Sequence, residues 1–384
     1  MEHSRSRPSD HEFVSARTLC LGMHAAYRCR HSGACCTAGW AIPVEGPALE
    51  TLRVHFGRER DLFQTEGPLP EGAAAILTID RHGACVFFDQ RNGQLCRVHR
   101  DMGPQYLPTA CRQFPRIGLH DARGTLISLS HYCPTAASLV TSGSSRDRFA
   151  IVTAPSSLAI DGGVEGLDAR DALPPLLTPD LLMDIEGYDA WERRAIAVFA
   201  SGRHAAAGCI GAIDEASRRL QCWRPGGDAL GAAAAREFAI ASAREDDEDL
   251  EIDVARLAAA DASVPQELRR PPPEAGIEHA WAQVAPWWPS VDPAVRAYLS
   301  ARLFGNWIAY YGQGLHAIVE YLRVCLSVVK LEAARHQARA LTTGSASSPW
   351  QTVTEAIRSA DLLLVHLSDP KDLARHLERT PRRA

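Results

Sequence analysis

Eight of the eleven cysteines in this 384-residue chain lie within its first 133 residues. A cysteine cluster of this density constrains the fold, because such residues join distant segments either as disulfides or as ligands of a metal. The other three occur singly in Ala-rich helical context, and we expect them to be small buried apolar residues. The clustered cysteines are Cys20, Cys29, Cys35, Cys36, Cys85, Cys96, Cys111 and Cys133, and the single ones are Cys209, Cys222 and Cys325.

Two features favour metal over disulfides. The number of cysteines is odd, and residues 1–10 are polar without the apolar core of a secretion signal. No run of 18 apolar residues that would predict a membrane-spanning helix is present in the sequence. We therefore expect a cytoplasmic protein with no membrane partner, in a compartment that keeps thiols reduced.

Composition excludes two broad classes of protein. Hydrophobic residues make up 46% and charged residues 23% of the chain, which is typical of a globular protein rather than a disordered one. The net charge of −5 comes without long basic runs, and this argues against nucleic acid as a partner.

The pattern along the chain predicts a mainly α protein with two domains. We expect an irregular cysteine-rich, metal-binding domain with short β-hairpins over residues 13–141 and a helical domain over 178–384, joined by a Ser-, Gly- and Pro-rich linker at 142–177. One expected hairpin pairs residues 84–89 with 95–99 around Asn92-Gly93, and another pairs 116–120 with 125–130.

Four dipeptides in the helical region combine a capping side chain with proline at the first helical position, which predicts a helix start at each. Apolar residues from Leu315 to Val329 recur at three- and four-residue spacing, which predicts one buried helix face. His366 is expected to be structural. The dipeptides are Thr178-Pro179, Asp292-Pro293, Ser348-Pro349 and Asp369-Pro370.

Thiolates are the preferred ligands of zinc and of iron–sulfur clusters. The candidate set has seven sulfurs, more than the four that one zinc needs, so either two sites exist or one site has additional structural cysteines. The adjacent pair suits a polynuclear cluster, two neighbouring metals, or one ligand and one core residue, and we favour iron–sulfur over zinc. The seven metal ligands predicted from the sequence are Cys29, Cys35, Cys36, Cys85, Cys96, Cys111 and Cys133.

The surroundings of the cluster add secondary candidates. His99, His131 and Cys20 are weaker ligand candidates, and His24 and His31 weaker still. Arg112 and Arg116 either pair with a negatively charged thiolate site or form ordinary structural contacts. Cys133 precedes Pro134 at a predicted helix start, where free amides are expected to lower the thiol pKa.

These motifs resemble a known family. The run from Cys29 through Cys35-Cys36 to Trp40 is similar to the opening motif of the flagellin lysine-N-methylase (FliB-like) proteins. The segments around Cys85, Cys96 and Leu107-Pro-Thr-Ala-Cys111, followed by Phe114-Pro-Arg116, resemble its continuation, and Ser130-His-Tyr-Cys133-Pro resembles its closing motif. The wider group is the YkgJ-type cysteine-cluster family, described as zinc- or iron-chelating.

The resemblance implies a metal or iron–sulfur site, with lysine N-methylation as the activity, S-adenosylmethionine as the methyl donor and a lysine-bearing, flagellin-like protein as the substrate. The sequence itself locates no methyl-donor site and assigns no catalytic residue. Two other hypotheses stay open: a non-catalytic metal-binding module that docks a partner, and a thiol redox sensor that uses the adjacent cysteines.

Overall fold

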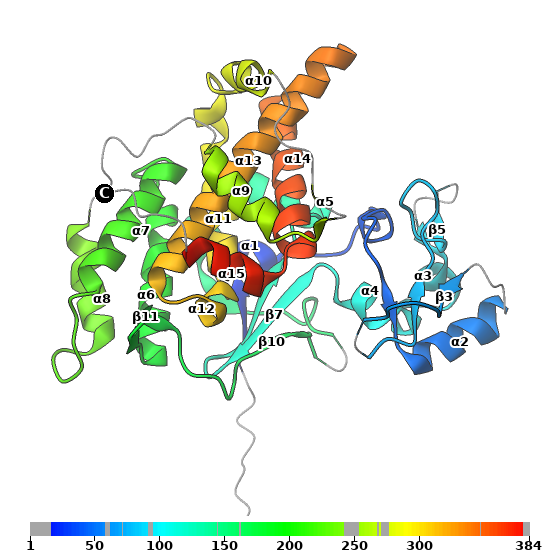
Figure 1. The fold of residues 1–384 in the computed structure, drawn as a ribbon, viewed down its shortest axis with the longest axis horizontal. Coiled ribbons are helices and arrows are strands. Elements are labelled where there is room, and N and C mark those ends of the chain that lie inside the picture. Colours follow the sequence, from blue (N-terminus) through cyan, green and yellow to red (C-terminus); the bar gives the residue numbers. More distant parts are fainter. Residues whose placement is uncertain are drawn as a thin grey trace, which may run out of the picture.

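The fold is described from a computed structural model. It covers residues 17–57, 62–70, 72–90, 95–143, 145–160, 163–241, 253–266, 269, 276–345 and 347–378. The start of the expected N-terminal domain and the Asn92-Gly93 turn lie outside these ranges. The chain is mainly α-helical, as predicted, and its strands are short (Figure 1). No described helix is both long and apolar enough to cross a bilayer.

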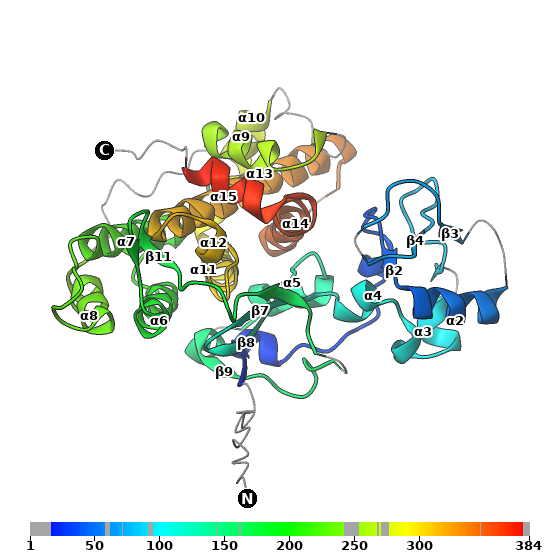
Figure 2. The same cartoon turned by 60° about the horizontal axis from the view of Figure 1, so that its bottom comes forward.

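Residues 29–113, here called the cysteine lobe, lie to one side of the other elements (Figures 1 and 2). A three-stranded sheet of order β2-β4-β3 and a core that includes Val44, Leu52 and Phe87 hold the lobe together. The other elements are short turns and helices. The elements of the lobe are η1 (Ala34–Cys36), β2 (Pro43–Val44), α2 (Gly46–Phe56), β3 (Phe63–Gln64), β4 (Ala75–Leu77), β5 (Phe88–Asp89), β6 (Leu95–Cys96), α3 (Arg97–Asp101), η2 (Pro104–Tyr106) and α4 (Thr109–Gln113).

A five-stranded sheet lies next to the lobe (Figure 2). The predicted hairpin is confirmed, since β7 (Arg116–Asp121) pairs antiparallel with β8 (Gly124–Leu129). Successive side chains of a strand point to opposite faces, and here Leu126 joins the main helical core whereas Ile127 joins a smaller core with Cys20. The order is β10-β7-β8-β1-β9, with β1 (Thr18–Leu21), β9 (Ile151–Thr153) and β10 (Gly166–Asp168).

The expected linker at 142–177 supplies two edge strands of this sheet. β9 pairs antiparallel with β1, and β10 pairs parallel with β7. Leu119 and Leu126 of the hairpin share one continuous core with Trp191 and Tyr298 of the helices. The sheet and the helical region therefore form one packed body, and the segment between them is part of its structure.

The helices form the larger part of this body, and the buried α13 packs against α7, α10, α11 and α14. Figure 2 shows the sheet lying against one side of the helices. The elements outside the lobe and the sheet are α1 (Gly22–Ala25), α5 (Pro134–Thr141), η3 (Arg146–Phe149), β11 (Leu176–Thr178), β12 (Leu181–Leu182), α6 (Ile185–Ser201), α7 (Ala206–Leu220), α8 (Leu230–Ile240), α9 (Val254–Ala262), α10 (Ile277–Val284), α11 (Trp288–Leu303), α12 (Ile308–Tyr311), α13 (Leu315–Thr343), α14 (Pro349–Asp361), the π-helical turn η6 (Leu362–Leu367) and α15 (Pro370–Glu378).

Two of the four predicted helix starts are confirmed. Ser348 forms a full capping box with Gln351, and Asp369 accepts hydrogen bonds from the first amides of α15. The prediction at Thr178 is wrong, because Thr178 ends β11 and α6 begins at Ile185. The prediction at Asp292-Pro293 is also wrong, because this pair lies inside α11, where the Asp292 carboxylate caps Ala206 of α7 instead.

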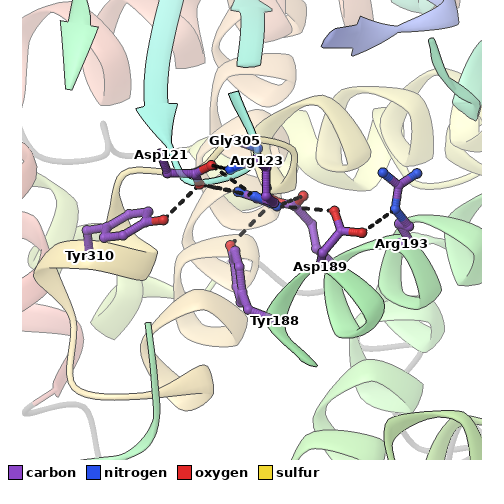
Figure 3. Close-up of polar contacts among 8 residues, drawn as sticks. Asp121, Arg123, Tyr188, Asp189, Arg193, Gly305 and Tyr310 are labelled. Atoms are coloured by element: carbon purple, nitrogen blue, oxygen red, sulfur yellow. Dashed lines mark hydrogen bonds and ion pairs between the residues drawn. The ribbon is translucent and has the colours of Figure 1, made fainter. Parts of the chain in front are cut away.

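A buried arginine joins the sheet to the helices (Figure 3). Arg123, at the tip of the β7–β8 hairpin, donates to Asp121 and to Glu192 of α6 at 2.7 Å each. Glu192 also accepts from the amide of Gly305, and Asp121 accepts from the Tyr310 hydroxyl. Because Arg123 and Glu192 are both buried, each side chain needs the opposite charge of the other to offset the cost of leaving water. This network fixes residues 305–310 against the sheet.

Candidate functional site

Six of the seven predicted ligand cysteines line one cavity of about 440 Å³. The cavity lies between the cysteine lobe and the start of α5, and no described bond links any two of the thiols as a disulfide. The seventh, Cys85, does not line the cavity but lies behind it, where its amide donates to the carbonyl of Cys36 at 2.7 Å. The lining thiols are those of Cys29, Cys35, Cys36, Cys96, Cys111 and Cys133.

Three thiols form the first group in this cavity. Cys35 and Cys36 lie in the tight turn η1, which follows Gly33 in a left-handed conformation with φ of 73°. Such a turn brings adjacent side chains together, and the two sulfurs are 3.9 Å apart. Cys96, at the N-cap position of α3, interacts with Cys36 and completes this group.

Interactions among these three thiols shift their pKa values in different directions. A bond from the Cys36 thiol lowers the pKa of Cys35 and lowers that of Cys96 to about 7, with the amides of α3 contributing at Cys96. The same bonds raise the pKa of Cys36, which is the donor in both. The group therefore favours two thiolates that share one thiol proton donor. Thiolate is the form that binds metal and the form that attacks disulfides.

Cys111 and Cys85 lie within electrostatic reach of this group. Cys111 is on α4, whose first amide, that of Thr109, donates to the carboxylate of Glu45. Burial, together with the negative charge of neighbouring thiolates, raises the pKa of Cys111. Burial also raises the pKa of Cys85 to about 12. Deprotonating these two thiols therefore requires a cation to replace the protons.

Cys29 and Cys133 form a second group at the same cavity. The hydroxyl of Tyr27 is 4.0 Å from the sulfur of Cys133, and the Cys29 sulfur accepts from the amide of His31 at 3.5 Å. Cys133 occupies the N-cap position of α5, as predicted. The predicted lowering of its pKa is wrong, because burial raises the pKa by more than the amides of Ala136 and Thr135 lower it.

The secondary candidates separate into two sets. His31 and His99 line the cavity, with ring centroids 4.8 Å apart. His131 and His24 do not line it. Both are buried, and His131, in the connection between β8 and α5, lies 3.0 Å from Asp361 and 3.2 Å from His24. Cys20 lies in β1 and does not line the cavity, although it shares a small core with Cys133.

The arginines of the motif also have different environments. Arg116 lines the cavity, but its guanidinium donates to the carbonyls of Leu158, Ser157 and Arg112, so its hydrogen bonds are structural. Arg112 also lines the cavity, and its buried Nε has no hydrogen-bond partner among the described residues. Cys209 and Cys325 are buried in α7 and α13, as expected. The expectation of burial is wrong for Cys222, which is exposed because it lies in the turn after α7.

The donor set suits a thiolate-bound metal in its chemistry. Within the described part of the chain, however, no three His, Cys, Asp or Glu side chains are already arranged as a metal centre. The Cys35–Cys36 separation of 3.9 Å is close to the ~3.8 Å between sulfurs on one tetrahedral zinc. The unpartnered Arg112 Nε beside several thiols is also consistent with an anionic centre in the cavity.

Sequence patterns did not indicate two features near the cavity. One is the aromatic stack of Trp40 on His366, and the other is a second cavity beside it, lined by Arg302 and Asn306. The only available signal was the presence of polar residues within the apolar stretch that begins at Leu303. No protein-family model, curated protein or solved structure matched this chain in the comparisons.

Proposed function

We propose that the cysteine cavity binds an iron–sulfur cluster or zinc, with the sulfurs of Cys35, Cys36, Cys96 and Cys111 as ligands. The observation that carries this proposal is that thiols from residues 29–133 line a single cavity. An apolar core does not require six thiols at one surface, whereas a polynuclear centre requires several sulfurs from different segments. On this proposal the cysteine lobe is a metal-binding domain.

The remaining thiols have separate parts in this proposal. Cys85 lies behind the first group, within electrostatic reach of Cys35 and Cys96, and would be an additional ligand there if a metal displaced its proton. Cys29 and Cys133 would hold a second metal or complete the shell of a cluster. The Arg112 guanidinium would offset the negative charge that several thiolates bring to a metal.

Metal binding would be coupled to protons and to folding. Burial and neighbouring charge raise the pKa values of Cys36 and Cys111, so a metal must displace their protons and binds more weakly as the pH falls. A site that is absent from the unfolded chain stabilises the folded form when it is filled. The lobe should therefore lose stability when the metal is removed.

A thiol redox pair is the second candidate, and the low pKa of Cys96 beside Cys36 favours it. The Cys96 thiolate would attack oxidised glutathione and release one glutathione thiolate. Cys36, after losing its proton, would attack the mixed disulfide, form the Cys36–Cys96 bond and release the second glutathione. The two cysteines together lose two electrons, which reduce oxidised glutathione to two thiol-level glutathiones, and the one proton released is that of the Cys36 thiol.

Lysine methylation stays a prediction that depends on the resemblance. It is tested separately, because saturable binding of S-adenosylmethionine by the full chain would favour the enzyme over a non-catalytic module. The cytoplasmic location proposed here fits both the metal and the redox candidates, since reduced thiols are required for each.

Anaerobic purification with metal analysis and an absorption spectrum distinguishes these candidates. A brown protein with visible charge-transfer bands and bound iron supports an iron–sulfur cluster, and a colourless protein with bound zinc supports zinc. A metal-free protein in which oxidised glutathione removes two thiols reversibly supports the redox pair and rejects the metal centre.

A further inference from the structure

A second cavity, of about 240 Å³, lies between the five-stranded sheet and the C-terminal helices. Its walls come from β7 and β8, from the end of α11 through the start of α12, and from η6 to α15. Most of its surface is apolar. The large apolar side chains on its walls are those of Phe304, Trp307, Ile308, Leu364 and Leu373.

Two buried donors on the walls of this cavity lack partners. Arg302 is 6% and Asn306 is 7% exposed, and neither Arg302 Nε nor Asn306 Nδ2 has a hydrogen-bond partner among the described residues. A buried donor without an acceptor is unfavourable, so native proteins rarely leave one without a reason. Two such donors on one small cavity indicate that an acceptor belongs there.

The other atoms of these two side chains are held in place. Arg302 Nη2 donates to the carbonyl of Leu129 at 2.6 Å, and Asn306 Oδ1 accepts from the amide of Ile308 at 2.9 Å. Residues 305–310 are fixed in turn by the Arg123–Glu192 pair, since Glu192 accepts from the amide of Gly305 (Figure 3). The unpartnered N–H groups are therefore positioned by the fold before any ligand binds.

The charges near the cavity favour an anion at these donors. Arg302 is positive and pairs through Nη1 with the buried Asp361 at 3.7 Å, a carboxylate whose charge is shared with the hydrogen bonds that it accepts from Tyr298 and His131. Among the described residues, the only acidic side chain on the lining is that of Glu165, which is exposed. An anion deep in the cavity would meet Arg302 and Asn306, whereas an apolar group would meet the aromatic walls.

We propose that this cavity binds a small monocarboxylate with an aromatic or branched apolar body. Its carboxylate accepts hydrogen bonds from Arg302 Nε and Asn306 Nδ2, and its apolar part packs on Phe304 and Trp307. A 150 Å³ cavity holds benzene, so the volume here suits a ligand of about ten non-hydrogen atoms. The site is separate from the cysteines and does not depend on their binding a metal.

Phenylacetate and phenylacetamide are matched probes of this proposal, because they have the same size and differ in charge. In isothermal titration calorimetry with the full chain, phenylacetate should bind at one site. The affinity of phenylacetamide should be lower by a factor of roughly ten or more. Failure of phenylacetate to bind, or equal binding of the acid and the amide, would overturn the proposal.

Asn306→Asp is the sharpest variant. It keeps an oxygen to accept from the Ile308 amide, but it replaces the unpartnered donor by a negative charge, so phenylacetate binding should fall at least about tenfold. Gln351→Glu makes the same chemical change at an exposed capping residue and should leave binding unchanged. Leu364→Trp fills the cavity and should also abolish binding, which covers the case that Asn306→Asp does not fold. Wild-type affinity in both cavity variants would contradict the proposal.

Discussion

The indole of Trp40 stacks on the imidazole of His366, with ring centroids 4.3 Å apart and planes inclined by 22°. Trp40 follows the adjacent cysteines in the lobe, and His366 lies in the π-helical turn η6 at the far end of the chain. Phe114 and Tyr132 pack around the same ring. One aromatic cluster therefore joins the cysteine lobe to the helical body.

Replacing Trp40 by alanine should weaken this junction. Trp40 is half-buried, so Trp40→Ala is expected to destabilise the protein by about 2 kcal/mol, somewhat less than the loss of a fully buried tryptophan. Urea unfolding of the full chain measures the change. Trp350→Ala, at a tryptophan that is 43% exposed, is the matched control and should have a much smaller effect. Equal effects of the two substitutions would contradict the role of the stack.

The protein should lose stability in mild acid. Burial lowers the pKa of His366 to about 4, against an ordinary value of 6.5. Between these pH values the unfolded chain binds the proton and the folded chain does not, so stability is full above pH 6.5 and falls as the pH drops towards about 4. One such group gives a slope of up to about 1.4 kcal/mol per pH unit.

Urea midpoints measured from pH 7 to pH 4 test this expectation. His366→Gln retains a partner for Ser130 but cannot titrate, so its profile should be shallower than that of the unmodified protein. Some acid sensitivity should persist, because burial also lowers the pKa values of His24 and His131. Parallel profiles for the variant and the unmodified protein would show that His366 does not contribute.

Removing the buried charge of Arg123 should be severely destabilising. Arg123→Met leaves Glu192 buried without its cation, and the expected loss is about 3–5 kcal/mol in urea unfolding. Adding Glu192→Met to this variant should recover part of the loss, because no unpaired charge then remains at that position. The exposed pair of Arg170 with Asp168 provides the control, and Arg170→Met should change stability little. A double variant no more stable than the single one would contradict the explanation.

Local patterns predicted what local interactions decide. The β7–β8 hairpin and the helix start at Ser348 depend on residues that are close in sequence, and both were predicted. Asp292-Pro293 carries the same local signal as Ser348-Pro349, but α11 begins earlier, at Trp288. The Asp292 side chain caps a different helix, which a reading of neighbouring residues cannot reveal.

Long-range pairing accounts for the other differences. The strands β9 and β10 are short, and they are regular only because they pair with β1 and β7. Their own residues carry no strand pattern, which is why the sequence predicted a linker at 142–177. The cysteines were identifiable as a group because their residue type carries chemical information wherever it occurs. Arg302 and Asn306 carry no such signal, since their unpartnered atoms become evident only when the surrounding side chains are in place.

The central claim is that the cavity thiols bind metal, and metal content per chain after anaerobic purification tests it most directly. The unmodified protein should contain stoichiometric iron with sulfide, or zinc. Cys111→Ser should lower both the metal content and the melting temperature, because it removes a ligand and the stability coupled to it. Cys222→Ser, at an exposed cysteine away from the cavity, should change neither. A metal-free unmodified protein, or equal metal content in all three proteins, would contradict the account.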